Sequence, residues 1–209
     1  ASAALEEKVV APDDLFDVSE GMIHFGARTI HDTTNYGTLS FTDVIVKSSN
    51  VGTILVGQEI GADRLDEYTR RFGFGRRLSQ DFIGENPGLV WPPENLDPSA
   101  LASASIGYQI GVTPLQMAVA TSVIANGGNL MEPHVVKALV AHGRRVKMKR
   151  EDPQRVITRA TATTVTSMME DVVRRGTATQ AQIPGYTIAG KTGTAAKFVN
   201  GAYSKRDRK

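Results

Sequence analysis

Several features are missing from the sequence, and each absence excludes a class of protein. There is no cysteine, which rules out a disulfide framework and a zinc site built on thiolates. No apolar run is long enough to cross a bilayer, and the N-terminal residues do not form a basic-then-apolar signal segment. If the protein works at a membrane, we expect its anchor to lie elsewhere.

An excess of charge of one sign is missing as well. The sequence has 24 Lys and Arg against 22 Asp and Glu, a formal net charge of +2 that gives no argument for a nucleic-acid partner. The locally basic run GRRVKMKR, residues 143–150, is predicted to be a solvated hairpin or loop. No metal is expected, because no spacing such as H-E-x-x-H relates His24, His31, His134 and His142.

The remaining composition is that of an ordinary globular protein. The 209 residues are 41% hydrophobic and 22% charged, enough for one or two domains with a sizeable core. Apolar spacing and stop signals predict helices over residues 41–47, 51–60, 65–72, 114–126 and 165–175. Other segments suggest the tail of a helix at 1–8, a small hairpin within 22–39, a proline-rich loop over 86–100 and a strand over 135–140.

The stretch GYTIAGKTGTA, residues 185–195, fits two chemistries. As G-x-x-x-x-G-K-T it is formally a phosphate-binding loop, and from Lys191 onward it is K-T-G-T, a strand that lines an acyl-transfer site. A phosphate loop needs a strand before it and a helix after it. Here the inner residues are β-prone, the preceding segment is polar, and Gly193 is a poor helical position, so a nucleotide site is disfavoured.

The alternative is an extended strand from Gly185 to about Lys197. Small residues let a ligand approach the backbone, while hydroxyls and an ammonium group suit a carboxylate. An edge strand with a surface lysine remains the simpler structural interpretation of this segment.

A second polar segment, KSSNVG, residues 47–52, separates two apolar helices. Ser48, Ser49 or Asn50 can cap the helix that begins near Val51. The same turn can instead present Ser48 and Asn50 to a cleft, where a hydroxyl relays a proton and a carboxamide orients substrate and a neighbouring amine. The two roles are compatible if Ser49 or the backbone provides the cap.

S-x-N followed much later by K-T-G is two thirds of the motif set of penicillin-binding proteins and serine β-lactamases. The blocks LSFTDVIVKSSNVGT, ASIGYQIGVTPLQMAVATSVIANGG and GYTIAGKTGTA together resemble the transpeptidase domain of class B penicillin-binding proteins, especially the type that builds the division septum. The resemblance covers nearly the whole chain. It implies an α+β fold, with an antiparallel sheet that has helices on both faces, plus a helical subdomain.

The resemblance also implies an activity and a place in the cell. A serine of the parent protein would attack the D-Ala-D-Ala carbonyl of a peptidoglycan stem peptide and pass the acyl group to the amine of another stem, and β-lactams would stop it at the acyl stage. The parent would be anchored in the bacterial cell membrane with this domain on the extracytoplasmic, periplasmic side. Its partners would include membrane proteins of the division complex, and no cofactor is expected.

Residue roles follow from the same resemblance. Ser48 and Asn50 would form the S-x-N corner, and Lys191 would support the proton network. Thr192 and Thr194 would bind the substrate carboxylate, with the Thr194 backbone N–H contributing to the oxyanion hole. Gly193 would keep the strand open.

One departure from the family pattern is serious. The S-x-x-K motif, which supplies the nucleophile and a neighbouring lysine, is absent, because no serine has lysine three residues later. We therefore expect residues 1–209 to be a partial transpeptidase domain, without the upstream S-x-x-K segment and the downstream last strands and closing helix. We expect such a chain to be inactive alone and, with unpaired strand edges, to self-associate.

Two rival functions remain open from the sequence. A serine β-lactamase shares the fold but needs a water-activating glutamate in a setting like E-x-x-L-N, which neither Glu85 nor Glu94 has. A non-enzymatic β-lactam-sensing or assembly module would keep the fold without turnover.

Overall fold

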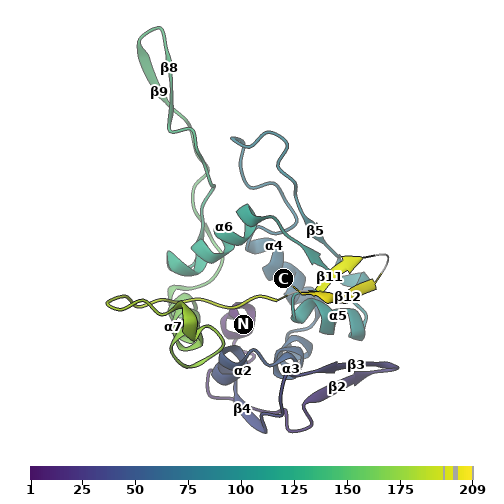
Figure 1. Cartoon of the computed structure of the whole chain (residues 1–209). Coiled ribbons are helices and arrows are strands. Elements are labelled where there is room, and N and C mark those ends of the chain that lie inside the picture. Colours follow the sequence, from purple (N-terminus) through teal and green to yellow (C-terminus); the bar gives the residue numbers. More distant parts are fainter. Residues whose placement is uncertain (195, 200–201, 209) are drawn as a thin grey trace.

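A computed structural model describes residues 1–194, 196–199 and 202–208, with the backbone alone described from residue 196 onward. Helices make up most of its regular structure (Figure 1). The α-helices are α1 (Ser2–Glu6), α2 (Phe41–Lys47), α3 (Asn50–Ile60), α4 (Ala62–Arg71), α5 (Pro98–Ser105), α6 (Pro114–Ala125) and α7 (Arg159–Arg175). Two short 3-10 helices are η1 (Pro93–Asn95) and η2 (Thr179–Ala181).

Within the described residues, the strands pair in twos. The strands are β1 (Leu15–Asp17), β2 (Met22–Phe25), β3 (Arg28–His31), β4 (Thr38–Ser40), β5 (Leu89–Val90), β6 (Ile110–Gly111), β7 (Asn129–Leu130), β8 (Ala138–Ala141), β9 (Arg144–Lys147), β10 (Gln154–Arg155), β11 (Ala196–Val199) and β12 (Ala202–Arg208). The pairs are β1 with β4, β2 with β3, β5 with β6, β7 with β10, β8 with β9 and β11 with β12, all antiparallel. The α+β class is confirmed, while the single larger sheet that the resemblance implies is not assembled within the described residues.

Helix α3 lies at the centre of the packing. Its buried Val51 and Val56 join a core with residues of α1, α2, β1, β4 and α7. Its Ile54 packs against β3 and α5 in a smaller cluster. Two glycines let neighbouring helices approach closely, since a Cβ on Gly52 would lie 2.5 Å from a Val44 methyl and one on Gly57 would overlap the Ser105 side chain. Burial of this kind contributes about 25 cal/mol per Å² of apolar area.

A second hydrophobic core connects α4 and α6 to α1 and α7. It contains buried side chains from α1, α4, α6 and α7. Tyr68 of α4 is 3% exposed, and its hydroxyl donates to the Glu7 carboxylate at 2.6 Å. Burial and that hydrogen bond raise the pKa of Tyr68 to about 12. The aromatic ring thus ties the N-terminal segment to α4.

The five predicted helices are confirmed, with ends that differ by a few residues. Helix α6 begins as the sequence indicates, because the Thr113 side chain accepts from the Gln116 N–H and Gln116 returns a bond to the Thr113 backbone. Helix α1 and the β2–β3 hairpin also lie where they are predicted.

Two predicted boundaries are wrong. The proline-rich loop ends early, because Asp97 accepts from the Ala100 N–H and Pro98 occupies the first turn of α5. The strand predicted over residues 135–140 begins only at Ala138. The N–H groups of Val135 and Val136 instead donate to Asp81, which keeps them out of strand pairing.

Candidate active site

The turn between α2 and α3 is shaped by two serines with different tasks. Ser48 ends α2 in the left-handed region, at φ 58° and ψ 44°. Ser49 is 1% exposed and caps α3, since its Oγ accepts from the Gly52 N–H at 2.9 Å. The cap predicted for this turn is therefore provided by Ser49, and the exposed Ser48 hydroxyl is left available for chemistry.

An aspartate that the sequence did not single out holds this turn in place. Asp32 follows β3, and its carboxylate accepts from the Ser49 hydroxyl at 2.6 Å and from the N–H groups of Asn50 and Val51 at 2.5 and 3.1 Å. A carboxylate at a helix N-terminus is favoured by the helix dipole and by the free N–H groups there. No local spacing could have identified it, because Asp32 and Ser49 are 17 residues apart.

Asn50 is oriented by the same strand end. Its side-chain amide donates to the His31 carbonyl at 2.8 Å. Of its polar side-chain atoms, the amide oxygen is the acceptor left for another group. The structure thus fixes the Asn50 side chain next to Ser48 on the same turn.

Lys191 reaches this turn from a segment 143 residues further along the chain. Its Nζ donates to the Ser48 hydroxyl at 2.8 Å and to the Thr192 carbonyl at 3.1 Å. Lys191, which the resemblance assigns to the proton network, is therefore in direct contact with Ser48 of the S-x-N corner. Among the described residues, none of the ion pairs involves Lys191.

The electrostatic state of Lys191 differs from that of a surface lysine. The residue is exposed as a whole, but its amine lies among protein atoms, and this desolvation lowers its pKa below the ordinary 10.5. Desolvation disfavours the charged form of an amine. Lys191 is thus closer to a neutral base than an isolated lysine would be.

The remaining predicted residues follow Lys191 along the chain. The Thr192 hydroxyl lies 2.7 Å from that of Thr177, just after α7. Gly193 and Thr194 are exposed, and the position of a Cβ on Gly193 has no other atom within 4 Å. The segment presents an open surface next to Lys191, although no contact tests the roles predicted for these two residues.

The strand predicted from Gly185 to about Lys197 is wrong over residues 185–194. These residues have no regular secondary structure, and the chain becomes a strand only at Ala196. Residue 195 lies outside the described part. Among the described residues, no strand pairs with this segment, and one backbone bond, from the Gly190 N–H to the Met169 carbonyl at 3.1 Å, ties it to α7. Without a paired edge, β-prone residues do not form a ladder.

Away from the Ser48 turn, the described residues have a cavity but no cluster of metal-ligating side chains. They contain no group of three or more His, Asp or Glu side chains arranged to hold a metal ion. A cavity of about 470 Å³ lies apart from the Ser48 turn, between α6 and α7, with Arg159 and Glu170 in its wall. In the same part of the chain, no helix has the length and apolar character needed to span a membrane.

Comparison with known proteins identifies relatives for this arrangement. The family model described as the penicillin binding protein transpeptidase domain matches residues 1–209. The penicillin-binding protein PbpB of Mycobacterium tuberculosis is 40% identical over 205 residues, which cover 93% of this chain and 30% of that protein. Stage V sporulation protein D of Bacillus subtilis is 31% identical over 207 residues, covering 97% of this chain and 32% of that protein. The chain therefore spans about a third of the length of these relatives.

Solved structures agree with the sequence matches. Penicillin-binding protein 3 of M. tuberculosis, in complex with aztreonam, superposes with a TM-score of 0.91 at 38% identity, covering 98% of this chain and 48% of that one. The transpeptidase domain of penicillin-binding protein 3 from Burkholderia pseudomallei gives 0.88 at 30% identity, covering 99% and 61%. The predicted resemblance and fold class are confirmed.

Proposed function

This chain belongs to the penicillin-binding protein transpeptidase family, and on that premise we propose that it is part of a serine D,D-transpeptidase that cross-links peptidoglycan stem peptides. The observation that carries the proposal is the 2.8 Å bond between the Lys191 amine and the Ser48 hydroxyl. A desolvated amine on a hydroxyl forms a proton-transfer pair, which acyl transfer to an amine requires. The complexes of a similar protein with aztreonam and ampicillin support a β-lactam-sensitive site.

In the proposed reaction, a segment outside this chain supplies the serine nucleophile, and this chain supplies the groups that move protons. A serine of an S-x-x-K motif attacks the carbonyl carbon between the two D-alanines, the C–N bond breaks, and the terminal D-alanine leaves with a proton. The amine of a second stem then attacks the ester, loses a proton and releases the serine. Ser48 and Lys191 relay these protons, and Asn50 orients the substrate amide.

Substrate binding falls to the residues after Lys191. The hydroxyls of Thr192 and Thr194 bind the terminal carboxylate, and the Thr194 N–H donates to the oxyanion that forms during attack. The contact between Thr192 and Thr177 supports a fixed position for the first hydroxyl. Open space beside Gly193 supports close approach of the substrate to the backbone.

The wider setting is part of the same proposal. We place the parent protein at the bacterial cell membrane, with this domain on the extracytoplasmic side and division-complex membrane proteins as partners. The septal subtype rests on the sequence blocks that resemble division-type enzymes.

The chain itself is proposed to be inactive, because a base without its nucleophile cannot form a covalent intermediate. The test incubates the 209-residue chain and a longer version that carries the S-x-x-K segment with a fluorescent penicillin, and follows intact mass. We expect a stoichiometric adduct on the longer protein alone. An adduct on the 209-residue chain would contradict the proposed inactivity, and absence of an adduct on the folded longer protein would contradict the proposed function.

The same experiment addresses a serine β-lactamase. Glu85 is poorly placed to activate water, since its Oε2 accepts from the backbone N–H groups of Leu78 and Ser79 at 2.8 and 3.1 Å and its Oε1 is buried. We expect the adduct of the longer protein to persist for hours, whereas a β-lactamase would release it within seconds. Self-association of the 209-residue chain stays a prediction, which light scattering tests.

A further inference from the structure

The hairpin formed by β8 and β9 projects away from the rest of the molecule (Figure 1). We refer to residues 136–149 as the arm. Nearly all of it is exposed, including large apolar side chains, with Leu139 at 55%, Val140 at 74% and Val146 at 57%. Leu139 and Val146 are cross-strand partners on one face of the hairpin, and Val140 lies opposite Arg145 on the other face. Adjacent exposed apolar side chains such as Leu139 and Val146 are typical of interaction sites.

The arm is strongly charged as well. It carries Lys137, Arg144, Arg145, Lys147 and Lys149, and no aspartate or glutamate. The whole chain has a formal net charge of only +2, so this concentration is local. An anionic partner therefore suits the arm by charge complementarity.

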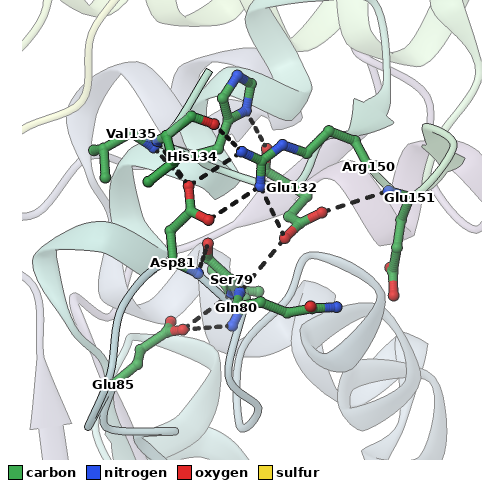
Figure 2. A network of polar contacts seen from close by, with 11 residues as sticks. Ser79, Gln80, Asp81, Glu85, Glu132, His134, Val135, Arg150 and Glu151 are labelled. Carbon is green, nitrogen blue, oxygen red and sulfur yellow. Dashed lines mark hydrogen bonds and ion pairs between the residues drawn. The ribbon is translucent and has the colours of Figure 1, made fainter. Parts of the chain in front are cut away.

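The base of the arm is fixed rather than loose. The Asp81 carboxylate meets the Arg150 guanidinium (Figure 2). The two bonds between them are 3.2 Å long, and the carboxylate also accepts from the N–H groups of Val135 and Val136 at 2.9 Å each. The Asp81 side chain is 4% exposed. Arg150 also donates to the Val136 carbonyl and lies 3.8 Å from Glu132. We call Asp81, Glu132 and Arg150 the clasp; it sets the direction in which the arm leaves the molecule.

Register and turn geometry decide which backbone groups of the arm face outward. His142 and Gly143 form a two-residue turn with φ of 51° and 73°, so Ala141 and Arg144 are the hydrogen-bonded pair next to the turn. Paired residues alternate between bonded and non-bonded positions. The next pair, Val140 and Arg145, therefore directs its N–H and C=O groups away from the hairpin.

The β9 edge combines this free backbone with the basic side chains. Within the described residues, β8 and β9 form a two-stranded sheet, so the outer edge of β9 has no strand beside it. A strand added there would place its side chains about 5 Å from those of Arg145, Val146 and Lys147. The pattern that fits is a carboxylate opposite each basic residue and an apolar side chain opposite Val146.

A membrane surface fits less well. The tip of the arm carries Arg144 and Arg145, with Val140 opposite Arg145, while the apolar Leu139 and Val146 lie further back. Those apolar side chains could enter the bilayer only after the charged tip. The arm also contains no Trp, Tyr or Phe, the residues that anchor proteins at membrane interfaces and stack on nucleic-acid bases.

We propose that the arm is a docking element for an acidic protein segment, which adds as a β-strand to the outer edge of β9. The clasp fixes the position of the arm before a partner binds, so binding costs the arm little conformational entropy. This surface is separate from the Ser48 turn and independent of the transpeptidase proposal.

The experiment uses the folded 209-residue chain and a fluorescent synthetic peptide with the core Glu-Val-Glu-Glu flanked by threonines. Binding is followed by anisotropy, with a Lys-Val-Lys-Lys peptide as the charge control and phosphatidylglycerol vesicles as the membrane alternative. We expect the acidic peptide alone to bind. Vesicle binding without peptide binding, or binding of neither probe, would overturn the proposal.

Matched variants separate charge from strand pairing. Arg145→Gln should weaken peptide binding about fivefold through lost charge. Arg145→Pro, which also removes an outward N–H, should weaken it about fivefold more. Val140→Pro removes an outward N–H from the opposite edge and should leave binding unchanged. If Arg145→Pro equals Arg145→Gln, or Val140→Pro has the larger effect, pairing at the β9 edge is wrong.

Discussion

The Ser48 turn and the clasp are both polar clusters that join distant segments, yet they differ in how their charges are satisfied. In the clasp, a carboxylate that is 4% exposed meets an arginine and two backbone N–H groups. At the Ser48 turn, a lysine meets a hydroxyl and a carbonyl. The clasp neutralises the charge of Asp81, whereas the charge of Lys191 has no counter-ion among the described residues.

The pKa values express this difference. Hydrogen bonds from Val136 and Arg150 lower the pKa of Asp81 to about 2, which keeps its carboxylate charged at neutral pH. Desolvation lowers the pKa of Lys191 and brings it nearer to losing its charge. A lowered pKa thus favours the charged carboxylate of Asp81. In the Lys191 amine, a lowered pKa favours the neutral form, which can accept a proton.

The largest expected effect is on acylation of the longer protein by a fluorescent penicillin. Lys191→Ala removes a proton-transfer group and should slow acylation by about 10³-fold. Arg150→Ala, a matched loss of a cation from the clasp, should leave the rate within about threefold of the unmodified protein, provided that circular dichroism shows a folded sample. Equal losses in the two variants would remove the distinction between the clusters.

Ser48→Gly should separate activity from stability. Loss of the relay hydroxyl should slow acylation by about 10²-fold. The same change relieves a left-handed residue at φ 58° and should raise the free energy of unfolding by about 0.5 kcal/mol, after the entropy cost of glycine. Thermal unfolding checks the second effect. Full acylation by this variant would contradict the role given to Ser48.

At the clasp, Asp81→Asn should loosen the base of the arm. The amides of Val135 and Val136 should exchange with solvent about tenfold faster, because the acceptor loses its charge. Asp66→Asn, which breaks another Asp–Arg pair on α4, is the control and should not change those two amides. Unchanged exchange in Asp81→Asn would show that the arm is held by other contacts.

The clasp should also respond to acid over a shifted range. Since the pKa of Asp81 falls from 3.8 to about 2 in the folded state, the clasp is fully stabilising above about pH 4 and is lost as pH falls toward 2. The amide chemical shifts of Val135 and Val136 should therefore titrate with a midpoint near pH 2. A midpoint near 3.8 would mean that the carboxylate gains nothing from its partners.

Local signals predicted the helices and, within the candidate site, the turn at Ser48. The cap at Thr113, the break at Ser48 and Ser49, and the apolar spacing of α7 are all readable within a few residues. The resemblance paired Ser48 with Lys191, although helix spacing alone could not, since 143 residues separate them.

The elements that the sequence left unpredicted depend on distant partners. Asp32 supports the turn and Asp81 the arm through contacts that span 17 and 69 residues. The segment after Gly185 has β-prone residues but no strand beside it in the described chain, so composition alone predicted a ladder that does not form. Asp97 and Pro98 are a local signal that was obscured by neighbouring prolines.

The most direct test of the account is the pKa of the Lys191 amine in the folded 209-residue chain. It is measured by NMR on lysine labelled at Nζ and assigned with Lys191→Arg. We predict a value below 10.5, with stability rising as pH increases from that value to 10.5, because the unfolded chain binds the extra proton. A pKa at or above 10.5 would show an ordinary surface lysine and would contradict the proton-transfer role at the Ser48 turn.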